Sequence, residues 1–140
     1  MSEEIPAPPE GFVRAQGRGR FSTHNGPYFH RIVEGEPPQQ AFFALPRHAN
    51  GVGLVHGGML SAFMDGVLAM AAGIGTGKSL VTIHLSIDFL HMARAGDWVF
   101  AEGRLTRATR EIAFAEGRAW SRGVDVVRAS GVFKLMERRH

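Results

Sequence analysis

A single carboxylate interrupts the most apolar stretch of the chain. Between Met59 and Ala72 the only charged residue is Asp65. A helix that is apolar on every side is normally buried, and a carboxylate is rarely buried without a partner or a purpose. We therefore interpret Asp65 as a functional residue. The alternative is a structural carboxylate that is hydrogen-bonded to a neighbouring strand.

A second chemical feature, His56-Gly57-Gly58, stands where this helix should begin. Unpaired amides at a helix N-terminus stabilise a negatively charged oxygen, and glycine at position 57 would let a ligand carbonyl approach. The alternative is a tight turn without a ligand. Asp65 follows Gly57 by eight residues, which is about 12 Å along a helix and too far for both to act on one carbonyl. Two helices packed antiparallel across a two-fold axis would bring Asp65 of one subunit to Gly57 of the other.

Five further residues are candidates for the same site. Thr82 and His84 lie on the more polar face of a predicted strand, where a hydroxyl could orient a water or the carboxylate, although threonine is also a common strand residue. Asn50 precedes the helix and could bind a ligand carbonyl or its own backbone. We expect Gly58, Ser61 and His84 to line the substrate site.

The elements that must position these residues follow from hydrophobic periodicity. The helix is predicted from 57 or 58 to about 72, where the glycines of 73–77 end it. Residues from 79 onward alternate with a period of two. The predicted strands cover 28–33, 40–45, 79–89, 98–106, 112–121 and 124–136, and Ile112, Phe114 and Trp120 are expected on one face of the fifth. Strands joined by short turns pair antiparallel, so the sequence predicts an α+β fold in which a curled sheet of about six strands wraps the helix. One sheet cannot cover the whole helix, so we expect at least a dimer.

Composition sets the broad class of the protein. The chain has 140 residues and 44% hydrophobic content, enough for one domain with a core, and no cysteine. A net charge of +3 with scattered basic residues does not indicate nucleic-acid binding. The acidic, proline-rich start does not resemble a signal peptide, and the apolar run is too short for a membrane helix, so we expect a cytoplasmic protein. Residues 1–26 are predicted to form an irregular arm and 27–140 a single domain. No His-x-x-x-His pair supports a metal site.

These residues carry a resemblance to a known family. Asn50-Gly-Val-Gly-Leu-Val-His56-Gly57-Gly58, followed by Asp65 and Thr82, is similar to the central motif of PaaI-type (phenylacetate-degradation-related) acyl-CoA thioesterases of the hotdog superfamily. The resemblance covers roughly 28–136. It departs at the N-terminus, where many relatives begin with a helix and this chain has its proline-rich arm.

The resemblance implies a hotdog homodimer, often a tetramer, that hydrolyses acyl-CoA thioesters without metal or cofactor. It implies that Asp65 is the general base or the nucleophile, and that the Gly57 amide polarises the thioester carbonyl. It further implies that Asn50 and His56 orient the thioester and the water, with Thr82 near the carboxylate. The acyl group would be small to medium or aromatic. A non-hydrolytic acyl-CoA-binding protein of the same fold is the alternative.

The phosphates of CoA require cations. Arg107 and Arg110 are the first candidates, and Lys78, Arg138 and Arg139 are others. An ordinary solvated surface is the alternative for each of them.

Overall fold

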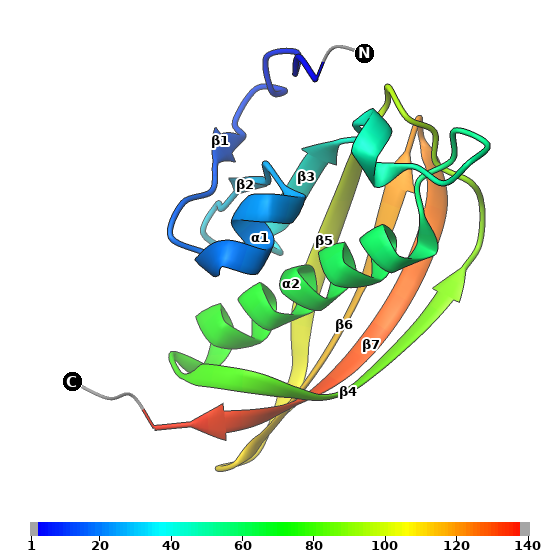
Figure 1. The fold of residues 1–140 in the computed structure, drawn as a ribbon. Helices are drawn as coiled ribbons and strands as arrows, with labels where there is room; N and C mark the ends of the chain where they lie inside the picture. Colours follow the sequence, from blue (N-terminus) through cyan, green and yellow to red (C-terminus); the bar gives the residue numbers. More distant parts are fainter. Residues whose placement is uncertain (1–2, 138–140) are drawn as a thin grey trace.

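A curled antiparallel sheet wraps one long helix in the computed structural model, which describes residues 3–137 (Figure 1). The sheet has seven strands in the order β1-β2-β3-β5-β6-β7-β4, and every neighbouring pair is antiparallel. In chain order the elements are β1 (Val13–Arg14), α1 (Gly19–Asn25), β2 (Phe29–Arg31), β3 (Gln39–Phe43), the 3-10 helix η1 (Pro46–His48), α2 (Gly57–Thr76), β4 (Ser79–Phe89), β5 (Trp98–Ala108), β6 (Ile112–Ser121) and β7 (Val124–Met136). This is the expected hotdog arrangement, and β1 is the strand that the sequence did not predict.

The central helix α2 starts where the sequence predicts and ends four residues later, at Thr76 rather than Ala72. His56 is its N-cap, and Gly77 ends it in the left-handed conformation (φ 70°). Within this extension Gly75 packs against a side chain of β5: a Cβ at this position would lie 2.7 Å from Leu105 Cδ2. Close packing against the sheet therefore outweighs the poor helix propensity of glycine.

The core lies between α2 and the concave face of the sheet. Phe63, Met64, Val67 and Leu68 are at most 1% exposed. The prediction that Ile112, Phe114 and Trp120 share one face of β6 agrees with the burial pattern, and this face points away from the core. The buried residues of the strand are Ala113, Ala115, Ala119 and Ser121, whereas Phe114 is exposed and Ile112 and Trp120 are half-buried. Small residues occupy the inner face because α2 approaches this strand closely.

The N-terminal arm is more ordered than expected. Residues 3–12 lack regular structure, but β1 pairs with β2, and 19–25 form α1. No residue of this helix is buried. Hydrogen bonds from Arg47 and His48 therefore hold it in place. The guanidinium of Arg47 donates to the carbonyl of His24 (2.9 Å) and to that of Gly26, and His48 Nε2 lies 2.6 Å from the carbonyl of Asn25.

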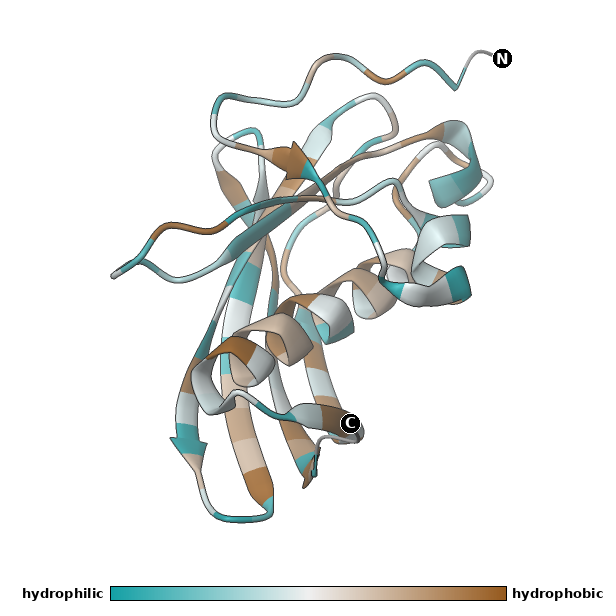
Figure 2. Cartoon of the chain, turned by 90° about the vertical axis from the view of Figure 1, so that its left-hand side faces the viewer, coloured by the Kyte–Doolittle hydropathy of each residue, from teal (hydrophilic) through white to brown (hydrophobic). Residues whose placement is uncertain are grey.

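By length and composition alone, α2 could cross a membrane, because it has 20 residues and is mostly apolar. The argument from the sequence that the run is too short is therefore wrong. In the view of Figure 2 the helix is mostly white to brown and lies across the sheet. Eight of its side chains are buried in the described structure, which is the packing of a core helix.

Candidate active site

Asp65 and Thr82 form a hydrogen-bonded pair between α2 and β4. The Thr82 hydroxyl donates to Asp65 Oδ1 at 2.7 Å. Asp65 is half-buried, and no cation within residues 3–137 forms an ion pair with its carboxylate. The structure therefore joins the two residues that the sequence placed near each other, and the second carboxylate oxygen accepts no hydrogen bond from the described part of the chain.

The helix surface around Asp65 is open and carries small side chains. Residues on the same side of a helix recur at intervals of three and four. Of the residues at these intervals, Gly58, Ala62, Ala69 and Gly73 are not buried, whereas Leu68 and Ala72, toward the sheet, are buried. The carboxylate therefore projects from a surface that a ligand or a second helix could approach closely.

The N-terminal turn of α2 has an unused amide. His56 Nδ1 accepts the amide of Gly58 at 2.8 Å, and the carbonyl of Gly57 accepts the hydroxyl of Ser61 at 2.8 Å. The Gly57 amide donates to no acceptor within the described residues. A Cβ at Gly57 would lie 3.4 Å from Phe89 Cζ, so an aromatic ring borders this amide. The Gly57 amide is thus oriented and free to donate to an anionic oxygen.

The remaining polar candidates are only partly available. Asn50 Oδ1 accepts the amides of Val52 (3.0 Å) and Leu54 (3.1 Å), so this oxygen fixes its own loop, as the structural alternative predicts. The side-chain nitrogen Nδ2 of Asn50 donates to no acceptor among residues 3–137, whereas its backbone amide donates to the carbonyl of Leu54 at 2.7 Å. His84 is exposed on β4 beyond a bulge that separates it from Thr82, and the structure gives it no contact with Asp65.

The predicted phosphate-binding cations lie far from Gly57 within one chain. Lys78 Nζ donates to the carbonyl of Arg110 at 3.3 Å, and both residues line a cavity of about 510 Å³ beyond the C-terminal end of α2. Arg107 is exposed at a bulge of β5. The 20-residue helix separates them from the Gly57 amide by about 30 Å. Arg138 and Arg139 lie outside the described residues.

The Asp65–Thr82 pair lies at an uncovered apolar edge of the sheet. β4 is the last strand in the sheet order and pairs only with β7. Val81, Ile83 and Phe89 are 56%, 57% and 55% exposed. The exposed apolar side chains continue beyond the strand at Leu90 and Met92. These apolar side chains would be removed from water only if another molecule covered this edge.

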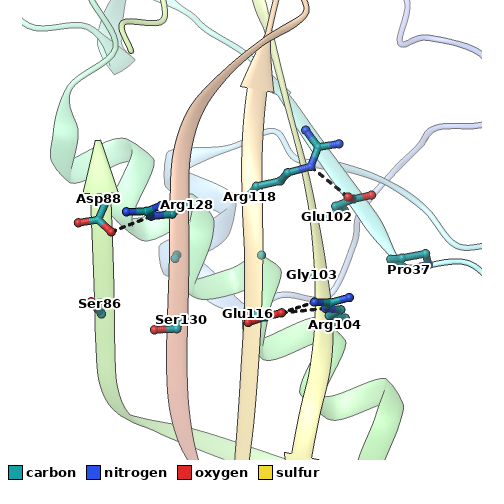
Figure 3. Close-up of a pocket in the computed structure, with 12 residues that line it drawn as sticks. Pro37, Ser86, Asp88, Glu102, Gly103, Arg104, Glu116, Arg118, Arg128 and Ser130 are labelled. Atoms are coloured by element: carbon teal, nitrogen blue, oxygen red, sulfur yellow. Dashed lines mark hydrogen bonds and ion pairs between the residues drawn. The ribbon is translucent and has the colours of Figure 1, made fainter. Parts of the chain in front are cut away.

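Another cavity, of about 520 Å³, lies on the face of the sheet that is turned away from α2. Figure 3 shows its side chains in front of the strands, with α2 behind them. Cross-strand ion pairs line it: Arg128 with Asp88 (3.0 Å), Arg118 with Glu102 (3.2 Å), and Arg104 with Glu116. The sheet separates this cavity from Asp65, and its arginines are already paired, so it is not the candidate site.

Sequence reasoning missed the residues on the other flank of α2. Arg18 and Gln40 contact the helix at Gly66, directly after Asp65. No signal in the sequence indicates this contact, because Arg18 belongs to a segment without hydrophobic periodicity. Within residues 3–137, no three His, Cys, Asp or Glu side chains are grouped so that they could hold a metal ion.

Comparison with known proteins places this geometry in a family. The model of the thioesterase superfamily matches residues 52–127. A protein of Pseudomonas aeruginosa provisionally named an esterase is 36% identical over 132 residues, which cover 91% of this chain and 96% of that protein. The 1,4-dihydroxy-2-naphthoyl-CoA thioesterase 2 of Arabidopsis thaliana is 35% identical over 68 residues, or 48% of this chain and 43% of that enzyme.

Solved structures show the same fold. A protein of Ralstonia eutropha JMP134, provisionally named a thioesterase and phenylacetic acid degradation-related, superposes with a TM-score of 0.74 at 28% identity and covers 84% of this chain and 92% of its own. A hypothetical thioesterase of Streptococcus pneumoniae TIGR4, solved with coenzyme A, gives 0.74 at 19% identity over 81% of this chain and 88% of its own. The chain belongs to the thioesterase superfamily and has its hotdog fold.

Proposed function

We propose that this protein is a PaaI-type acyl-CoA thioesterase that hydrolyses small-to-medium or aromatic acyl-CoA thioesters. Its active unit is a homodimer with two composite sites. In each site Asp65 of one subunit meets Gly57 of the partner subunit. A tetramer would be a pair of such dimers.

The observation that carries this proposal is the Asp65–Thr82 pair on the open side of α2. A hydroxyl holds one carboxylate oxygen and leaves the other unbonded within the described structure. The nearest feature that can stabilise an oxyanion, the free Gly57 amide, lies about 12 Å along the same helix. One thioester carbonyl cannot contact both within one chain, so a second subunit must complete the site.

The uncovered edge of β4 supports the second subunit. An edge strand of 11 residues with exposed apolar side chains is a template for pairing with another strand. A two-fold axis beside β4 would cover this edge with its own copy. The same axis would set the two α2 helices antiparallel with their small-residue sides facing, which places the Gly57 amide of the partner subunit near Asp65.

The reaction follows from these groups. The thioester carbonyl accepts a hydrogen bond from the Gly57 amide of the partner subunit, which stabilises the oxyanion of the tetrahedral intermediate. Asp65 either removes a proton from the attacking water or attacks the carbonyl carbon itself, after which water releases the acid from the mixed anhydride. In the first route the carbon–sulfur bond breaks as the tetrahedral intermediate collapses, and Asp65 returns the proton taken from water to the sulfur of CoA. In the second route the carbon–sulfur bond breaks as the anhydride forms, and the CoA thiolate is protonated by solvent. His56 and Asn50 orient the thioester and the water.

The relatives support CoA as the leaving group. The Streptococcus pneumoniae protein was solved with coenzyme A, and further structures of it carry an aspartate or a threonine replaced by alanine. The Arabidopsis thaliana relative is named for a CoA thioester. In an antiparallel dimer the C-terminal end of one α2 lies toward the N-terminal end of the other, so Lys78 and Arg110 of the subunit that supplies Asp65 are candidates for the CoA phosphates.

Asp65→Asn tests the proposal. The amide keeps the shape of the side chain and can accept the Thr82 hydroxyl, but it cannot act as a base or nucleophile. We expect kcat to fall by about 10²–10⁴-fold across a panel of acyl-CoA esters, measured as released thiol. Wild-type turnover in this variant would remove Asp65 from the mechanism. Stable acyl-CoA binding without thiol release by the wild type would instead identify a non-hydrolytic acyl-CoA-binding protein.

A further inference from the structure

An arginine from the N-terminal arm contacts α2 at the residue that directly follows the catalytic candidate. Arg18 Nη2 is 3.1 Å from the position that a Cβ on Gly66 would occupy. Arg18 Nη1 donates to Gln40 Oε1 at 2.7 Å, and its guanidinium carbon lies 5.7 Å from the centre of the Tyr28 ring. Gly66 directly follows Asp65 on the helix. Consecutive helix residues point about 100° apart, so the guanidinium lies about a quarter turn around α2 from the carboxylate, on the flank of β3.

The guanidinium of Arg18 has no carboxylate counter-ion within residues 3–137. Burial lowers the pKa of this guanidinium, an effect that the nearby Tyr28 partly opposes. Among the described residues no carboxylate pairs with it, and its Nε and Nη2 groups donate to no acceptor. Six other arginines pair with carboxylates, namely Arg31, Arg47, Arg104, Arg118, Arg122 and Arg128. A half-buried cation without a counter-ion is a binding position for an anion.

Gln40 holds this cation in a fixed position. Its side chain is 1% exposed within β3, and its amide nitrogen donates to the carbonyl of Gly66 at 3.1 Å and lies 3.5 Å from Met70 Sδ. The Gln40 oxygen is therefore oriented toward Arg18 by the helix backbone. A guanidinium that is held by a buried partner loses little further freedom when it binds a carboxylate.

We propose that Arg18 determines substrate specificity by binding a carboxylate at the far end of the acyl group. The substrate class is then an acyl-CoA in which the acyl group is the monothioester of a dicarboxylic acid. This inference rests on the proposed function, because it takes the thioester to be held beside Asp65. CoA phosphates are a poorer fit, since the pantetheine arm places them far from the reacting carbonyl.

A purely structural role for Arg18 makes a different prediction. If the side chain only fastens the arm to α2, its removal would weaken hydrolysis of every ester alike. A contact with the CoA phosphates would also affect every ester alike, because all of them carry the same CoA. Selective loss of carboxylated substrates separates the proposed role from both alternatives.

The test compares glutaryl-CoA with pentanoyl-CoA, which share the chain length and differ in the terminal carboxylate. We expect the wild type to favour glutaryl-CoA in kcat/KM. Arg18→Met, which keeps the length of the side chain and removes its charge, should lower the ratio of the two kcat/KM values by about 10- to 100-fold. Arg18→Lys should restore part of the ratio. Arg20→Met, at an exposed arginine of the same arm, should leave the ratio unchanged.

An equal loss of both substrates in Arg18→Met, or a wild type that prefers pentanoyl-CoA, would overturn the inference. Calorimetric binding of the two esters keeps this result separate from the proposed function. If the wild type hydrolyses no ester of the acyl-CoA panel, the proposed function fails, and the inference is then decided by binding. Tighter binding of glutaryl-CoA that Arg18→Met abolishes would sustain it, and equal binding of the two esters would end it.

Discussion

The two flanks of α2 differ in how they are covered. On the flank of β3 the chain covers its own helix: Arg18 and Gln40 meet the backbone at Gly66, and α1 lies beside them (Figure 1). On the flank of β4 the helix meets Thr82, but the apolar side chains of that strand stay exposed. The chain thus closes one flank itself and leaves the other exposed, and Asp65 lies on the open side, where we propose that the second subunit packs.

The two edges of the sheet show the same contrast. β1, at one edge, has two residues and offers little template for pairing. β4, at the other edge, has 11 residues and exposes Val81 and Ile83. Natural proteins keep exposed edges short or charged unless the edge is used. The difference supports the proposal that β4, and not β1, forms the dimer interface.

Among changes to the two flanks, loss of the free amide at the start of α2 should have the largest effect. Gly57→Pro removes its N–H and breaks no hydrogen bond within the helix, because proline is well accepted at the first helical position. His56 already has the extended backbone (φ −62°, ψ 137°) that a following proline requires. We expect kcat to fall by about 10²–10³-fold with the thermal stability retained.

Gly57→Ala is the matched control for this change, since it adds a methyl group and keeps the N–H. Its Cβ would lie at an ordinary contact distance of 3.4 Å from the ring of Phe89. The alanine variant should retain at least about tenfold more activity than the proline variant. Equal activity in the two variants would show that the amide does not act in catalysis.

A charge on each edge of the sheet tests the contrast between β4 and β1. Ile83→Lys should weaken the dimer, because it places a desolvated cation in the proposed interface. We expect dissociation in sedimentation experiments and a fall in activity of about tenfold at low protein concentration, recovered at high concentration by mass action. Val13→Lys, an equally exposed position on β1, should change neither property. A dimer that withstands the first change and not the second would reverse the assignment of the interface.

The smallest expected effect concerns His48, which supports the covered flank. Burial lowers the pKa of His48, and the positive charge of Arg47 lowers it further. Hydrogen bonds to the carbonyls of Asn25 and Gly26 oppose this shift. Its Nδ1 accepts the amide of Leu45 at 3.0 Å, so the folded state favours the neutral ring. The unfolded chain binds a proton near pH 6.5, and stability should therefore decrease as the pH falls below that value.

His48→Gln should weaken this pH dependence while lowering the stability at neutral pH, and the effect on Tm at pH 5 relative to pH 8 should amount to a few degrees. His24→Gln, at an exposed histidine of α1, is the control. An unchanged pH dependence in the His48 variant would contradict the assignment of the neutral ring.

The open side of the site was largely accessible to sequence reasoning. A lone carboxylate in an apolar helix, and a glycine pair at its start, are local patterns with direct physical meaning, and both are positioned as expected. The end of the helix was not, because contact of Gly75 with Leu105 is a tertiary effect. The strand pattern of β6 also does not say which of its faces points inward, because close approach of α2 favours alanines such as Ala113 over large apolar residues on the inner face.

The covered flank was inaccessible for a related reason. The arm has no hydrophobic periodicity, and its helix is held by polar contacts from η1, such as Arg47 to the carbonyl of His24. Such contacts join residues distant in sequence, so no local pattern indicates them. The contact of Arg18 with α2 therefore could not be predicted from the sequence.

Subunit complementation tests the shared site most directly. Asp65→Asn and Gly57→Pro each inactivate both sites of a homodimer. In a mixed dimer, purified through two different tags, one site combines both substitutions and the other combines an intact Asp65 with the intact Gly57 of the partner subunit. We predict that the mixed dimer recovers about half of the wild-type activity, because one of its two sites is complete. A mixed dimer no more active than its parents would contradict the account and place both groups of the site within one chain.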